Sequence, residues 1–130
     1  MPEVTHTPTG QYPKPSEVHR LDLTAAADAL RARLPGSRRQ TESLAREDGV
    51  SVVMMAMEAG DTIRDHAAEG VSTVHLLDGH ITVTYSDQDA DLRAGEMLVF
   101  QPGVRHHLQA EEQSIVLLTI TGAETVTVEQ

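Results

Sequence analysis

The sequence predicts an all-β domain, either a sandwich or a barrel, preceded by one short helix. From residue 50 onward, short runs rich in β-branched and aliphatic residues are separated by turn signals that recur every 8 to 15 residues. Many short strands at such regular spacing are typical of antiparallel sandwiches and barrels. A chain of 130 residues has the size of one domain and can bury a core without disulfide bonds.

The composition divides the chain into three parts. Residues 1–17 hold four of the six prolines and show no hydrophobic period, so we expect a flexible N-terminal arm there. An alternative is that this arm docks across a partner subunit. Residues 18–49 are expected to form a helix and a lead-in segment, and residues 50–130 the barrel.

The expected helix lies in the lead-in region. Thr24 is the candidate N-cap, and Ala25 to Leu34 is rich in residues of high helix propensity. Leu30 and Leu34 lie four residues apart and therefore share one face of the helix. Pro35-Gly36 ends the helix, because proline cannot continue the helical hydrogen-bond pattern. We expect this helix to pack on the outside of a sheet.

A two-residue hairpin turn is expected at Asp78-Gly79, between strands over Val71 to Leu77 and Ile81 to Ser86. Alternation along the two strands places one apolar set on the core face and turns His75 and His80 outward, unless a β-bulge reverses the order. The expected core face consists of Ser72, Val74, Leu76, Ile81, Val83 and Tyr85. Further strands are expected over residues 50–58, 97–100, 106–110, 115–121 and 125–128.

The overall composition argues against several classes of partner. The net charge is -10 and the chain has no basic stripe, so nucleic acid is not an expected partner. The absence of cysteine excludes a disulfide framework, a thiolate nucleophile and a cysteine-based zinc site. No apolar run is long enough to cross a bilayer and no signal peptide is visible, so we expect no membrane partner and a cytoplasmic protein.

Two short patterns in the barrel region carry the most functional information. The first consists of Gly60, five residues, His66, and then positions 68, 72 and 79. The second consists of Gly95, five residues, position 101, Gly103, His106 and position 110. Both resemble, in order and with the right spacing, the two sequence motifs of the cupin superfamily. The resemblance implies a double-stranded β-helix, also called a jelly-roll barrel.

The resemblance also implies a divalent metal site, because cupins bind metal through two histidines and a glutamate of the first motif and one histidine of the second. In this chain the second histidine of the first motif is Ala68 and the glutamate is Ser72. Only His66 and His106 remain as possible metal ligands, with Glu69 as a third candidate. Because Fe, Mn, Zn and Ni sites generally use three or more protein ligands, the metal site is expected to be degenerate.

The second motif departs from the family pattern at two further positions, where Gln101 replaces a proline and Ala110 an asparagine. His66, His106 and Tyr85 are candidate catalytic groups, since imidazoles suit acid–base work near neutral pH. Candidate ligand-binding residues are Ser72, Tyr85, Met55, Met57 and Gln101, with core packing as the alternative role for the two methionines.

Three functions stay open at this point. The first is a cupin that binds a small organic molecule, acting in binding, sensing or metal-free chemistry. The second is a metal-dependent cupin enzyme, a dioxygenase or isomerase, that uses His66 and His106 as ligands. The third is a structural or regulatory module without pocket chemistry. The family resemblance and an expected exposed edge strand also suggest a homodimer.

Overall fold

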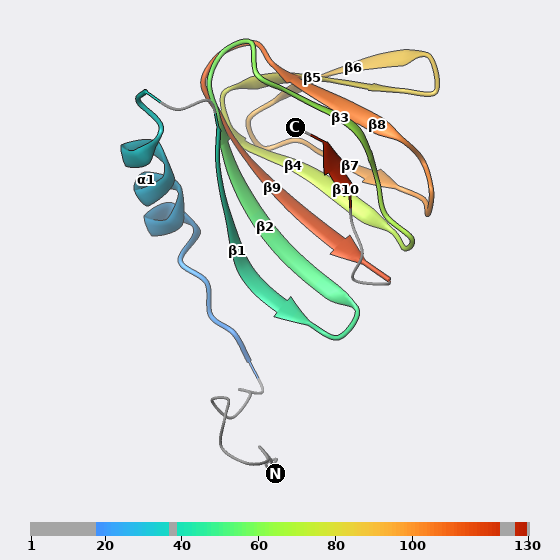
Figure 1. The fold of residues 1–130 in the computed structure, drawn as a ribbon, viewed down its shortest axis with the longest axis horizontal. Helices are drawn as coiled ribbons and strands as arrows, with labels where there is room; N and C mark the ends of the chain where they lie inside the picture. Colours follow the sequence, from blue (N-terminus) through green and yellow to red (C-terminus); the bar gives the residue numbers. More distant parts are fainter. Residues whose placement is uncertain (1–17, 37–38, 123–126, 130) are drawn as a thin grey trace, which may run out of the picture.

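The computed structural model describes residues 18–36, 39–122 and 127–129, with backbone alone at 65, 66 and 127–129. Two antiparallel sheets face one another, and a helix lies against the outside of one of them (Figure 1). The predicted arm over residues 1–17 lies outside the described residues. The elements are α1 (Leu23–Arg33), β1 (Arg39–Glu47), β2 (Val50–Met57), β3 (Thr62–Ala67), β4 (Ser72–Asp78), β5 (His80–Tyr85), β6 (Gln88–Arg93), β7 (Met97–Phe100), β8 (His106–Ala110), β9 (Ser114–Thr121) and β10 (Thr127–Glu129).

The strand order confirms the predicted jelly roll. The first sheet has the order β1-β2-β9-β4-β7, and the second has the order β10-β3-β8-β5-β6. From β2 to β5 the chain passes to the other sheet at every step, and it does so again from β6 to β9. Apart from the pairs β1–β2 and β5–β6, neighbouring strands in each sheet are therefore far apart in sequence, as in a double-stranded β-helix. In the described part of the chain, no helix is long and apolar enough to cross a membrane.

Helix α1 was predicted at nearly the right place but with the wrong N-cap. Asp22 is the cap, in an extended conformation, and its carboxylate accepts a hydrogen bond of 3.0 Å from the backbone N–H of Ala25. Thr24 lies inside the first turn instead. A carboxylate at this position satisfies an N–H group that the helix leaves unpaired and also interacts favourably with the helix dipole. The helix ends at Arg33, with Leu34 as its C-cap directly before Pro35, where the helix was predicted to stop.

The helix covers part of the outer face of the first sheet. Ala27, Leu30 and Leu34 are buried against Met54 and Ala56 of β2 and Ile115 of β9. These three sheet residues alternate with residues that point into the barrel. Strands β2 and β9 are therefore apolar on both faces, which explains the continuous hydrophobic run over residues 52–57.

The predicted hairpin at Asp78-Gly79 is wrong. Strand β4 pairs with β7 and β9, whereas β5 pairs with β6 and β8, so the two strands belong to opposite sheets. Gly79, with φ of +98°, marks the corner where the chain crosses between the sheets. A Cβ atom at this position would lie under 3.0 Å from the Ser114 hydroxyl and the Gln113 carbonyl, so the corner needs glycine.

The predicted faces are nevertheless correct. The expected core residues of β4 and β5 are buried, apart from half-buried Tyr85, while His75 and His80 are more exposed on the outer faces. Two strands that face each other across the interior show the same alternation as two strands that pair side by side. Alternation thus predicted which side chains point inward but could not predict the pairing.

Candidate functional site

The barrel interior is arranged in layers, and one of its end layers is polar. Across the first sheet, the backbone register aligns Ser51, Ile120, Ser72 and Phe100 in one row. The neighbouring rows of this sheet contain aliphatic residues and methionines, among them Val74 and Leu118. We call the end row, together with the row that faces it from the second sheet, the polar layer.

The facing row comes from the second sheet. Its backbone register aligns His66, His106 and Tyr85 on β3, β8 and β5. Phe100 joins the two rows, because its ring stacks on the His106 imidazole with centroids 4.1 Å apart and 7° between the planes. The same ring meets Tyr85 edge-on at a centroid distance of 5.4 Å. The polar layer therefore contains two of the three aromatic residues of the chain.

His106 is a buried and neutral imidazole. Its residue surface is 3% exposed, and its Nδ1 donates a hydrogen bond of 3.2 Å to the carbonyl of Val104. Burial lowers the pKa of His106, and the Val104 hydrogen bond offsets only part of this effect. With the proton on Nδ1, Nε2 carries the lone pair and can act as a hydrogen-bond acceptor, a base or a metal ligand.

The position of His66 is known from its backbone alone, and its side chain lies outside the described part of the structure. The register aligns His66 with His106 on neighbouring strands, after a β-bulge that begins beyond Ile63. The sequence patterns place these histidines 40 residues apart, and the fold brings their backbones together.

The polar layer also holds two buried serines. Ser51 is 7% exposed and Ser72 is 3% exposed, and both lie on the inner face of the first sheet. Neither hydroxyl has a hydrogen-bond partner within the described ranges of the chain. Ser72 was predicted to be a site residue. Ser51 was missed because it precedes both sequence motifs.

Two other motif positions are apolar. Ala68 and Ala110 are buried in the core, at 5% and 1% exposure. The backbone still links the two motifs, since the N–H of Gly103 donates a hydrogen bond of 2.9 Å to the carbonyl of Ala68. The two motifs are thus in backbone contact, although position 68 carries a methyl group that cannot bind metal. Among the side chains that the structure describes, no group of three His, Cys, Asp or Glu residues could hold a metal ion.

The remaining predicted site residues lie elsewhere. Glu69 is exposed in the bend after β3, and Gln101 is exposed directly after β7. Met55 and Met57 are fully buried in the main core cluster, at 1% and 0% exposure. A role of these four residues in binding stays a prediction, and their placement favours solvent contact for the first two and core packing for the methionines.

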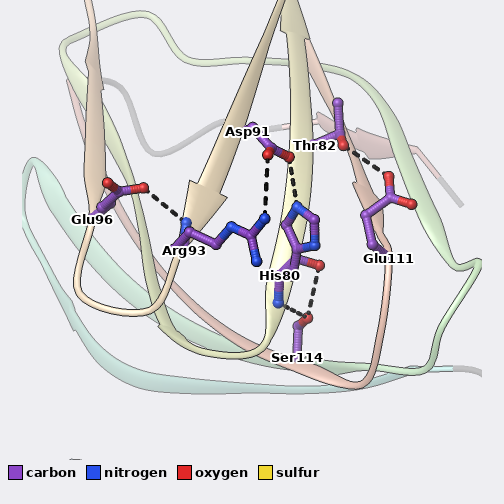
Figure 2. A network of polar contacts seen from close by, with 7 residues as sticks. All are labelled: His80, Thr82, Asp91, Arg93, Glu96, Glu111 and Ser114. Carbon is purple, nitrogen blue, oxygen red and sulfur yellow. Dashed lines mark hydrogen bonds and ion pairs between the residues drawn. The ribbon is translucent and has the colours of Figure 1, made fainter.

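The outward histidine His80 belongs to a separate polar network on the outer face of the second sheet (Figure 2). Its Nε2 lies 2.5 Å from a carboxylate oxygen of Asp91, and this hydrogen bond lowers the pKa of Asp91. Nearby, the Thr82 hydroxyl donates a hydrogen bond of 2.7 Å to the Glu111 carboxylate. His80, Thr82, Asp91 and Glu111 on this outer face thus have polar partners, in contrast to the serines of the polar layer.

A surface groove of about 240 Å³ lies between α1 and β4, lined by Leu23, Thr24, Ala27, Arg31, Leu77 and Asp78. The Arg31 guanidinium pairs with the carboxylates of Asp28 and Asp78, each at 2.9 Å. Because Leu77 points to the outer face of the first sheet, this groove is separate from the polar layer.

Phe100 is the other site residue that the sequence patterns missed. It is one of only three Phe, Tyr or Trp residues in the chain and lies outside the motif positions. In a core otherwise built of aliphatic side chains and methionines, its rarity is the one signal that could have drawn attention to it.

Comparison with known protein families agrees with this architecture. A family model described as a cupin domain matches residues 53–121, more than half of the 130-residue chain. The chain belongs to the cupin family. Comparison of this cupin with curated proteins finds no match.

Solved structures support the same assignment of the fold. A cupin superfamily protein from Desulfitobacterium hafniense matches with a TM-score of 0.63 and 19% identity, over 65% of this cupin and 77% of that chain. A conserved protein of unknown function from Streptococcus pyogenes matches with a TM-score of 0.62 and 22% identity. This match covers 68% of this cupin and 77% of the Streptococcus chain. At such identities the likeness concerns the fold alone.

A longer enzyme chain also contains this fold. Salicylate 1,2-dioxygenase from Pseudoaminobacter salicylatoxidans, in adducts with gentisate, matches with a TM-score of 0.70 and 16% identity. The match covers 84% of this cupin but 36% of the dioxygenase chain. This cupin therefore spans about a third of that enzyme's length.

Proposed function

We propose that this cupin binds a small organic molecule at the polar layer and does so without a divalent metal. One observation carries the proposal: two of the four positions that supply metal ligands in the cupin motifs are Ala68 and Ser72. A methyl group cannot coordinate a metal, and a neutral serine hydroxyl is a poor substitute for a carboxylate. The described donor set therefore does not fit a metal centre of three or more ligands.

The groups that remain suit hydrogen bonding to an organic molecule. His106 offers a neutral imidazole, and Tyr85 and Ser72 offer hydroxyl groups, all at one end of the barrel. A neutral histidine can accept a proton near neutral pH, so the same arrangement also permits acid–base chemistry on a bound molecule. His66, aligned with His106, is the second imidazole candidate for this role.

Metal analysis of untagged protein tests the proposal. Mass spectrometry should find far less than one Fe, Mn, Zn or Ni per chain, both in the natural protein and in a His66→Ala, His106→Ala double variant. A library of small organic molecules should still raise the melting temperature in the presence of a chelator, because a ligand that binds the folded state stabilises it. One metal per chain in the natural protein, lost in the double variant, would refute the proposal.

A metal-dependent enzyme is the second candidate. The alignment of His66 with His106 in the register favours it, since neighbouring imidazoles are common metal ligands. The likeness to salicylate 1,2-dioxygenase adds a fold-level analogy. This candidate needs a third ligand, for which Glu69 is the residue to replace first once metal is found.

A further inference from the structure

The Ser72 hydroxyl differs from the comparable buried hydroxyl of Ser114. Ser114 is 1% exposed, and its hydroxyl accepts a hydrogen bond of 3.1 Å from the His80 N–H and donates one of 2.7 Å to the Glu112 carbonyl. Ser72 is 3% exposed, yet its hydroxyl has no hydrogen-bond partner within residues 18–36, 39–122 and 127–129. A buried hydroxyl without a partner disfavours the folded state, so an alanine would suit this position better if packing were its only role.

The surroundings of Ser72 are aromatic on one side. Its register partner on β7 is Phe100, whose ring contacts both Tyr85 and His106. A flat, unsaturated molecule next to Ser72 could pack against these aromatic rings in the stacked or edge-to-face arrangements that aromatic pairs prefer.

Among its described side chains, which do not include that of His66, the polar layer holds no charge that could balance an ionic ligand. The buried polar residues of the described chain are Ser51, Ser72, His106 and Ser114, and all four are neutral at neutral pH. Placing a carboxylate or an ammonium group there would bury an unpaired charge, which is strongly unfavourable. The net charge of -10 further opposes the approach of anions.

We infer that the polar layer selects an uncharged, planar molecule with a hydrogen-bonding group, and that the Ser72 hydroxyl is the group that binds it. The inference rests on the proposed function and adds the ligand class and a specificity-determining residue. Amides and other neutral carbonyl compounds belong to this class, because their oxygen can accept a hydrogen bond from a serine hydroxyl.

Three probes of the same shape and different charge test the ligand class. At neutral pH, benzamide is neutral, benzoate is an anion and benzamidine is a cation. Binding is followed by NMR of the Phe100 and Tyr85 rings, with a chelator present and probe concentrations in the millimolar range. Benzamide should shift these signals, and the two charged probes should bind at least about tenfold more weakly, because neither charge finds a buried partner. Equal or tighter binding of either charged probe would overturn the inference, as would the absence of any shift with benzamide.

The Ser72→Ala variant tests the residue, with Thr73→Val as the matched control on the outward face of the same strand. Ser72→Ala should weaken benzamide binding about tenfold, the amount that one lost hydrogen bond represents. It should not lower the melting temperature, because the hydroxyl has no partner to lose. Thr73→Val should leave the benzamide affinity unchanged.

Unchanged affinity of Ser72→Ala, or a large fall in its melting temperature, would refute the role assigned to Ser72. These outcomes are distinguishable from failure of the proposed function, which the metal analysis decides. A metal-free protein that binds benzoate in preference to benzamide would still be a metal-independent binding cupin, but with a different ligand class.

Discussion

The ring of Phe100 lies flat against the imidazole of His106, although the two residues come from opposite sheets of the barrel. Phe100 ends β7 in the first sheet, and His106 begins β8 in the second. The stack therefore removes one face of the imidazole from water. Burial of this kind keeps His106 in its neutral form.

The first prediction concerns this stack. In a Phe100→Leu variant, the imidazole should become better hydrated, so the pKa of His106 should rise toward the ordinary value of 6.5. NMR titration of the His106 ring measures this directly. Tyr85→Phe is the control, since it keeps an aromatic ring against Phe100 and should leave the pKa in place. An unchanged pKa in Phe100→Leu would mean that other neighbours cause the desolvation.

The second prediction is a loss of stability in mild acid. Because the pKa of His106 is lower in the folded than in the unfolded protein, the unfolded chain binds more protons below pH 6.5. The contribution of His106 to the free energy of unfolding is therefore full above pH 6.5 and is lost as the pH falls through the folded-state pKa.

Urea denaturation over a pH series measures this slope. A His106→Leu variant should lack that part of the slope, whereas His75→Gln, on the outer face of β4, should retain it. Identical pH profiles for the natural protein and His106→Leu would contradict the prediction.

The sequence predicted most strands that have a buried face, including the edge strand β7, but it missed β1, β3 and β6. Strands over residues 97–100 and 106–110 were expected with their observed bounds, because aliphatic residues and turn signals mark them. Strand β6 (Gln88–Arg93) was missed because it is an edge strand in which Leu92 is the one buried residue. Strand β1 is likewise a polar edge strand, and its sequence shows no alternation of period two.

Only those parts of the candidate site that leave a local signal in the sequence could be predicted. Spacing within the motifs pointed to His106 and Ser72, and alternation pointed to Tyr85, because these signals are local in the sequence. The contact of Phe100 with His106 depends on how two sheets face each other, and no local pattern carries that information. Ser51 joins the layer through the register of β2 with β9, which is equally non-local.

The third prediction tests why the corner at Gly79 needs glycine. Gly60 and Gly79 have similar φ values of +90° and +98°, but an added Cβ would meet nothing within 4 Å at Gly60. Gly60→Ala should therefore lower the free energy of unfolding by about 1–2 kcal/mol, from the left-handed conformation alone. Gly79→Ala should lower it by a further ~1–3 kcal/mol, because the new methyl group overlaps the segment at Gln113 and Ser114. Chemical denaturation compares the two variants, and equal losses would show that the close approach at the corner is relaxed without strain.

The fourth prediction concerns self-association through strand β7, the edge of the first sheet opposite β1. Its outward side chains, Met97 and Val99, are 48% and 58% exposed, and the strand contains no charged residue. Exposed edges of this kind are templates for a further strand, and a lysine is a common device that prevents such pairing.

We expect two copies to associate and Val99→Lys to shift the equilibrium toward the monomer in light scattering over a range of concentrations. Thr41→Lys, on the polar edge strand β1, is the control and should leave association unchanged. A natural protein that stays monomeric at every concentration, or a Val99→Lys variant that associates as strongly, would exclude this edge as the contact surface.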